Sequence, residues 1–124
     1  MPAEPVTIWL GITPPSTNRS RHRHVQHTHA MKKRLQRDIE TLLLQSKLPR
    51  DLSGVEAVAV MRFPVRRRRD TVNYWLLDKA LGDALVNGGW LKDDTPEHYH
   101  LRMRFDLEPG PARTTIVLTP TVMA

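Results

Sequence analysis

Hydrophobic positions in the first half of the chain follow the period of a strand and then the period of a helix. Residues 5–12 (PVTIWLGI) are rich in β-branched and aromatic side chains and predict a strand. Pro14 and Pro15 end it, because proline cannot donate to a sheet ladder. After a polar loop at residues 16–29, apolar side chains recur every three or four positions from about residue 30 to 45, which predicts an amphipathic helix. The helix face that we expect to be buried consists of Met31, Leu35, Ile39, Leu42 and Leu43.

The second half of the chain predicts a strand, a helix and two final strands. The strand covers residues 55–63, and the helix covers about residues 71–87, where two glycines end it. Residues 98–107 and 114–118 predict the last two strands, joined by a turn. The order β-α-β-α-β-β predicts a single small α+β domain, residues 1–124, in which a mixed β-sheet packs with two main helices.

The amino-acid composition limits the compartment in which we expect this domain. The chain has 124 residues and no cysteine, so neither a disulfide framework nor a cysteine zinc site is possible. The N-terminal residues lack a basic region followed by a long apolar run, which argues against a secretory signal. No apolar stretch approaches the ~20 residues that cross a bilayer. We therefore expect a soluble protein of the cytoplasm with no membrane contact.

The charge balance points to an anionic partner. Nineteen lysines and arginines against 13 acidic residues give a net charge of +6. Nucleic acid fits this excess better than an anionic membrane, because the chain has no basic amphipathic helix with a bulky apolar face. The arginines gather at Arg19, Arg21 and Arg23 in the first loop and at Arg66–Arg69 after the second predicted strand.

Residues 66–94 (RRRRDTVNYWLLDKALGDALVNGGWLKDD) carry the candidate chemistry. An arginine cluster is followed by Asp70 at a strand-to-helix junction, Lys79 inside the helix, and Asp93 and Asp94 after it. Phosphodiester hydrolysis needs such a set, because carboxylates bind Mg²⁺ while arginine and lysine offset the charge that grows on the phosphate. The order of these residues predicts a metal-dependent nuclease.

Spacing decides which acids can cooperate. Asp70 and Asp83 are 13 residues apart and would lie roughly 20 Å from each other along a helix, too far to share one metal ion. Asp93 or Asp94 can return beside Asp70, since an extended run of seven or eight residues covers about 25 Å. Neighbouring residues of an extended chain point to opposite faces, so we expect one of these two as a ligand. Lys79 and Asp83, four residues apart, are expected to pair on one helix face.

The segment resembles the RusA family of phage and prophage Holliday junction resolvases. Their pattern has an arginine-rich strand end, then Asp-x-Asp-Asn, a helical lysine, Asp-Ala-Leu four residues later and a Trp-Leu-x-Asp-Asp-like turn. The turn Pro14-Pro15-Ser16-Thr17-Asn18 is also similar to the family's Pro-Pro-Ser-x-Asn turn. The other matching residues are Arg67, Arg68, Arg69, Asp70, Asn73, Lys79, Asp83-Ala84-Leu85, Gly88-Gly89-Trp90-Leu91 and Asp93-Asp94.

The resemblance implies an activity and its residues. Asp70 and Asp94 would be metal-binding catalytic acids, with Asp93 in reserve, and Lys79 would be a catalytic lysine. It also implies a homodimer that requires Mg²⁺, with Mn²⁺ as a substitute, and that resolves four-way junctions or similar branched DNA by paired symmetric nicks in a bacterial cytoplasm. The residues expected to contact DNA are Asn18, Arg19, Arg21, Arg66, Arg67, Arg68, Arg69 and Asn73.

Two departures from the family pattern leave alternatives open. Val72 occupies the position of the second aspartate and cannot bind a metal, and three additional residues separate Asn73 from Lys79. Asp93, Asp78, Asn73 or a water molecule can supply the metal ligand that Val72 lacks. The alternative function is a catalytically inactive protein that binds branched DNA on the same scaffold. An RNA-binding domain is a weaker reading, because no RNP-like or KH-like motif is present.

Several of these residues also have ordinary structural explanations. Asp70 before a helix is a common N-cap, worth ~1 kcal/mol. Tyr74 and Trp75 can stack on unpaired bases or pack in a core or at a dimer interface. The first loop contains four histidines, His22, His24, His27 and His29. They suggest either a metal-binding tract or a basic flap that touches the DNA backbone, and we prefer the flap.

Overall fold

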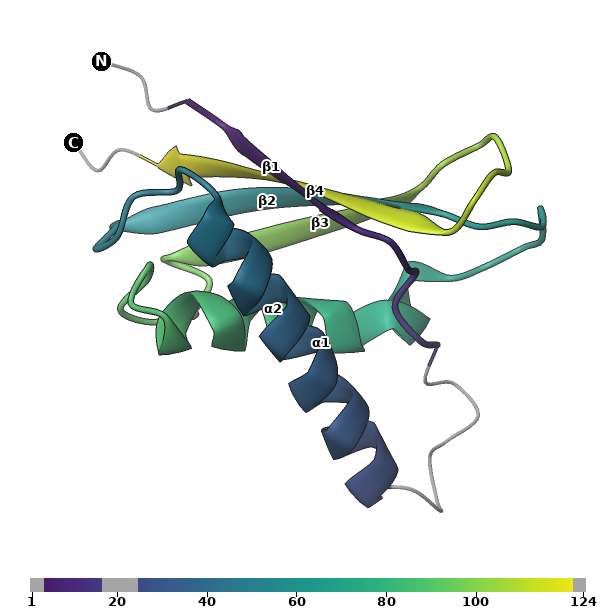
Figure 1. The fold of residues 1–124 in the computed structure, drawn as a ribbon, viewed down its shortest axis with the longest axis horizontal. Helices are drawn as coiled ribbons and strands as arrows, with labels where there is room; N and C mark the ends of the chain where they lie inside the picture. The colour runs from purple at the N-terminus through teal and green to yellow at the C-terminus, as the bar shows by residue number, and fades with distance from the viewer. Residues whose placement is uncertain (1–3, 17–24, 122–124) are drawn as a thin grey trace.

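Four strands form one mixed sheet, and two helices cover one of its faces (Figure 1). The computed structural model describes residues 4–16 and 25–121. Its elements are β1 (Val6–Leu10), α1 (Val25–Gln45), β2 (Gly54–Arg62), a 3₁₀ turn η1 (Thr71–Tyr74), α2 (Trp75–Asn87), β3 (Tyr99–Phe105) and β4 (Arg113–Thr121). The protein is therefore a single α+β domain of order β-α-β-α-β-β, as the hydrophobic pattern predicts. In the described part of the chain, no helix is both long and apolar enough to cross a membrane.

The order of strands across the sheet is β1-β4-β2-β3. The β1–β4 and β4–β2 pairs are antiparallel, and the β2–β3 pair is parallel. The parallel pair follows from the connection between its strands, since η1 and α2 form the crossover that a parallel pair needs. This crossover places α2 beside β3, at one edge of the sheet.

The core lies between the sheet and the helices. Every second residue of β1, β2 and β4 is buried on the helix-covered face, as alternation in a half-covered sheet requires. The helices meet this face with the apolar stripes that the sequence predicts. Fully buried members of the core are Ile39 and Leu43 of α1, Leu77, Leu81 and Leu85 of α2, Ala59 and Met61 of β2, and Ile116 and Leu118 of β4.

Several predicted boundaries differ from the structure. β4 continues to Thr121, beyond the predicted end at residue 118, and β1 covers Val6–Leu10 and not residues 5–12. The first helix begins at Val25 and not near Ala30, so the predicted polar loop at residues 16–29 ends earlier and His29 is helical. Figure 1 shows the first turns of α1 extending beyond the sheet, where no apolar stripe is required to mark a helix. The helix predicted for residues 71–87 is also divided, because η1 precedes α2.

The end of α2 follows a Schellman motif. Gly89 has a φ of +78°, which glycine adopts without steric cost, and its N–H donates to the Val86 carbonyl at 3.1 Å. The Trp90 N–H donates to the Leu85 carbonyl at 2.9 Å, and the Trp90 indole donates to the Leu48 carbonyl at 3.2 Å. The segment after α2 therefore leaves the helix along a fixed path.

Candidate functional site

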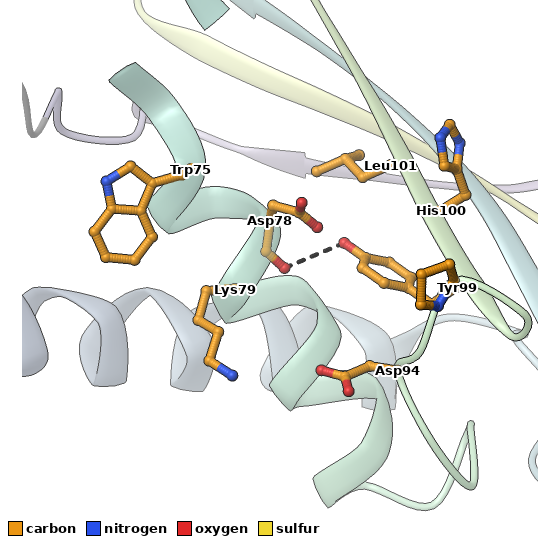
Figure 2. A pocket seen from close by; sticks show the side chains of 8 residues that line it. Trp75, Asp78, Lys79, Asp94, Tyr99, His100 and Leu101 are labelled. Atoms are coloured by element: carbon orange, nitrogen blue, oxygen red, sulfur yellow. Dashed lines mark hydrogen bonds between the residues drawn. The ribbon is translucent and has the colours of Figure 1, made fainter. Parts of the chain in front are cut away.

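An open hollow lies between α2 and the first residues of β3. We call it the Asp94 hollow; its volume is about 470 Å³, and it is drawn in Figure 2. Its lining combines acidic, basic and aromatic side chains from α2, from the loop after α2 and from β3. They are Trp75, Asp78, Lys79, Asp94, Pro96, Tyr99, His100 and Leu101.

Asp94 reaches this hollow because α2 has a glycine where the acid crosses it. A Cβ atom at Gly82 would lie 3.0 Å from Asp94 Oδ2 and 3.3 Å from Tyr99 Cε2. The chain after Asp94 is fixed by a turn in which the N–H groups of His98 and Tyr99 donate to the Thr95 carbonyl at 2.8 and 2.9 Å. The missing side chain at Gly82 thus sets the position of the carboxylate against the helix.

Tyr99 lies between the carboxylates of this site. Its ring is buried, and its hydroxyl donates to the Asp78 carbonyl oxygen at 3.2 Å, the contact drawn in Figure 2. Burial raises the pKa of the Tyr99 hydroxyl far above its ordinary value of 10, and the negative charges of Asp78, Asp94 and Asp83 raise it further. The hydroxyl is therefore neutral and acts as a donor at the floor of the hollow.

Lys79 is the basic group of the hollow. Its side chain is half exposed, and its Nζ lies 3.5 Å from Asp83 Oδ1, which confirms the predicted pair at four residues' separation. Asp83 makes a closer ion pair with Lys32 of α1, at 2.6 Å. Asp83 therefore has two lysine partners, and the half-exposed ammonium of Lys79 is accessible to an anion in the hollow.

The structure brings together some of the predicted site residues and leaves others apart. Asp94 and Lys79 share the hollow, while Asp70 and Asp93 are exposed and are not among its lining residues. Asp70 precedes η1 at its N-cap, where its carbonyl accepts from the Asn73 N–H at 3.1 Å but its side chain makes no capping bond. Asp94 meets α2 at Gly82, which follows Asp70 by twelve residues and by the division between η1 and α2.

No group of three histidine, cysteine or acidic side chains is placed to hold a metal ion among residues 4–16 and 25–121. Two carboxylates do line the Asp94 hollow, those of Asp78 and Asp94. Mg²⁺ suits such a site, because it keeps several waters and is bound through one or two carboxylates together with the phosphates of its substrate. Asp78 and Asp94 are therefore the carboxylates of the hollow that would hold Mg²⁺, and the Tyr99 ring lies between them (Figure 2).

The predicted DNA-contacting residues divide into four groups. Arg66, Arg67 and Arg68 are exposed in the loop between β2 and η1. Arg69 is tied to that loop, since its guanidinium lies 3.7 Å from the Phe63 ring centroid and donates to the Val65 and Arg67 carbonyls. Asn73 lies in η1 and is half-buried. Asn18, Arg19 and Arg21 lie outside the described residues, as do His22 and His24.

The two adjacent aromatic residues have different environments. Tyr74 is buried and packs its ring against Phe63 and Phe105, so it belongs to the core. Trp75 is 45% exposed and lines the Asp94 hollow. Of the two predicted stacking candidates, only Trp75 is therefore accessible to a base.

Sequence reasoning missed Tyr99 and His100 and named Asp78 only as one of four substitutes for the absent aspartate. A usable signal was Gly82, because an isolated glycine inside a helical pattern often marks a close approach of another segment. Comparison with known proteins adds no assignment, since no family model matches the chain and no curated protein is similar to it.

Proposed function

We propose that the protein is a Mg²⁺-dependent endonuclease that cuts four-way junctions or similar branched DNA. The observation that carries this proposal is the Asp94 hollow, where Asp78, Asp94 and Lys79 line one open space beside a neutral tyrosine hydroxyl. Two carboxylates and one half-exposed ammonium form the combination that phosphodiester hydrolysis needs. The resemblance to RusA resolvases adds the class of substrate.

Each residue of the hollow has a role in this proposal. Asp78 and Asp94 would hold Mg²⁺, which would polarise the phosphate and lower the pKa of a bound water. Lys79 binds a non-bridging phosphate oxygen and offsets its growing charge. Tyr99 supports the Asp78 end of helix α2 through its hydrogen bond. Trp75, exposed at the rim, stacks on a base next to the scissile phosphate.

The substrate also determines the proposed assembly. A four-way junction presents two equivalent strands about a two-fold axis, so a symmetric homodimer with one hollow in each copy suits paired nicks.

Arg66, Arg67 and Arg68 contact backbone phosphates. Mn²⁺ replaces Mg²⁺ at the same oxygen ligands. Such an enzyme acts in a bacterial cytoplasm that contains phage or prophage DNA.

The test is cleavage of a labelled synthetic four-way junction, beside linear duplex of the same sequence, in Mg²⁺. We expect paired symmetric nicks in the junction alone. Asp94→Asn and Asp78→Asn should each lower the cleavage rate about 100-fold or more, as loss of a group that stabilises the transition state does. Asp38→Asn, on the exposed side of α1, is the matched control and should cut normally.

Asp70→Asn separates this metal site from the one that the family resemblance implies. If Asp78 and Asp94 form the site, Asp70→Asn cuts at a rate close to that of the unmodified protein. If Asp70→Asn is inactive while Asp78→Asn is active, Asp70 is the ligand and the assignment of Asp78 is wrong. Circular dichroism of each variant establishes that it is folded.

A second candidate function is binding of branched DNA without cleavage. Val72, which occupies the place of the family's second aspartate, is 68% exposed on η1 and offers no ligand. Tight junction binding with no nicks in either Mg²⁺ or Mn²⁺ would establish this function and overturn the nuclease. Competition by structured RNA at equal concentration would instead favour an RNA ligand.

A further inference from the structure

None of the described helices or loops covers the face of the sheet opposite α1 and α2 (Figure 1). We call it the open face. Strand register arranges its side chains in rows that cross from β1 through β4 and β2 to β3. One row is Trp9, Thr115, Val60 and Arg104, and the next is Thr7, Val117, Val58 and Arg102. An aromatic ring therefore lies at one edge of the open face, β-branched side chains lie at its centre, and arginines lie at its other edge.

The charge of the open face is strongly positive. His100, Arg102 and Arg104 alternate along β3 and are exposed; we call them the basic row. Arg62 and Arg113 are cross-strand neighbours at one end of the face. The one acidic side chain among these strand residues is Glu56. Within the described part of the chain, none of the arginines of this face lies in an ion pair with an acidic residue.

The dimensions of the open face suit one extended polyanion. Alternate residues of a strand are about 6.8 Å apart, so the basic row places three groups over about 14 Å. Three strand spacings, also about 14 Å, separate the basic row from the edge strand that carries Trp9. Trp9 is 56% exposed, which leaves its ring available for stacking.

We propose that the open face binds an unpaired DNA strand, with phosphates on the basic row and bases over Trp9 and the β-branched centre. Single-stranded nucleic acid is bound in this way elsewhere, by a positive track along the backbone and aromatic side chains beneath the bases. The proposal rests on the proposed function in one respect, that DNA is the ligand. His100 belongs to both the basic row and the lining of the Asp94 hollow, so the strand leads directly to that hollow.

A second copy of the chain fits this face less well. Two copies related by a two-fold axis would bring like faces together, and each carries four exposed or half-exposed arginines against one glutamate. Like charges that face each other across an interface are unfavourable, whereas the phosphates of a nucleic acid neutralise them. The observations therefore favour a polyanion over a homodimer at the open face.

Anisotropy of a labelled oligothymidylate in EDTA, where no cleavage occurs, tests the proposal. The double variant Arg102→Gln/Arg104→Gln should bind the strand at least tenfold more weakly, and the slope of log K against log salt should fall by about 1.4, since each lost phosphate contact removes about 0.7. Trp9→Leu should weaken binding about tenfold through loss of base stacking. Arg34→Gln/Arg37→Gln, on the exposed side of α1, removes the same charge and should bind normally.

The outcomes separate this proposal from its alternatives. Equal binding by the open-face variants and the α1 control would overturn it. So would conversion of a dimer to a monomer by Trp9→Leu or by the double arginine variant, measured by light scattering, because the open face would then be an interface between copies. Binding as expected, with no junction cleavage in Mg²⁺, would sustain the open-face site while the proposed nuclease fails.

Discussion

At the scale of single residues, Gly82 determines where the candidate metal ligand lies. A glycine inside a helix costs about 1 kcal/mol relative to alanine, so this position is unfavourable for α2 alone. The compensating gain is the approach of Asp94 and Tyr99 to the helix backbone, so close that an added methyl group would displace them by a few tenths of an ångström. The absence of a side chain at Gly82 therefore lets Asp94 pack against α2, and this packing sets the geometry of the site.

Gly82→Ala tests this connection. We expect the cleavage rate to fall about tenfold, because the added methyl group displaces the Asp94 carboxylate by a few tenths of an ångström and a full 1 Å costs about 100-fold. Stability should change little, because the better helix propensity of alanine offsets the poorer packing. The measurement is junction cleavage together with urea denaturation. Gly11→Ala, where an added Cβ contacts nothing, is the control, and undiminished cleavage by Gly82→Ala would contradict the assigned position of Asp94.

Tyr99 gives a prediction about alkaline pH. Its raised pKa in the folded protein means that the folded state holds the hydroxyl proton more tightly than the unfolded state does. This contribution to stability is fully present below the unfolded pKa of about 10 and is lost as the pH rises above it. The free energy of unfolding should therefore fall by about 1.4 kcal/mol for each pH unit above about 10.

Tyr99→Phe should remove that slope. At neutral pH the variant should lose about 1 kcal/mol of stability, because the hydrogen bond to the Asp78 carbonyl is absent. Urea denaturation of both proteins from neutral pH to about pH 11 measures the two effects. An equal decline of stability in the two proteins would contradict the role of Tyr99.

At the scale of elements, the end of α2 directs the loop that carries the acids. Sequence alone predicted this end, since paired glycines after an apolar stripe are typical of a left-handed cap. It did not predict the division of residues 71–87 into η1 and α2, because both conformations present similar spacing of apolar residues. That division leaves Asp70 and Asp78 at the starts of two separate elements.

Substitution of Gly89 tests the cap. Gly89→Ala should lower the free energy of unfolding by about 1–2 kcal/mol, the cost of the left-handed conformation for a residue with a Cβ. Gly89→Asn should lose less, because asparagine tolerates this conformation. Denaturant midpoints of the three proteins give the order glycine, asparagine, alanine, and an alanine variant as stable as the unmodified protein would exclude strain at this position.

At the scale of the whole molecule, element order and core could be read from periodicity alone. The sheet order, the parallel β2–β3 pair and the open face could not, because they depend on contacts between segments far apart in the chain. For the site, motif order pointed to Asp94 and Lys79, which the structure does bring together. Asp78 and Tyr99 depend on which residues of α2 and β3 face each other, and linear spacing does not specify that relation.

At this scale, the arginines of the loop between β2 and η1 give a prediction about the salt dependence of DNA binding. If Arg66, Arg67 and Arg68 each bind a phosphate, their triple replacement by glutamine should reduce the slope of log K against log salt for junction binding by about 2.7. A triple replacement of Lys33, Arg34 and Arg37 changes the net charge equally and should leave the slope nearly unchanged. Equal slopes in the two triple variants would mean that the arginine loop makes no specific phosphate contact.

The basic row also bears on how the protein avoids self-association. β3 is an edge strand, and an unpaired strand edge is a template on which another chain can add and begin an aggregate. Arg102 and Arg104 bring repulsive charge to that edge, and charged edge residues are a common protection against such growth. The positive charge at this edge therefore helps to keep a small one-sided sheet from extending into a fibril.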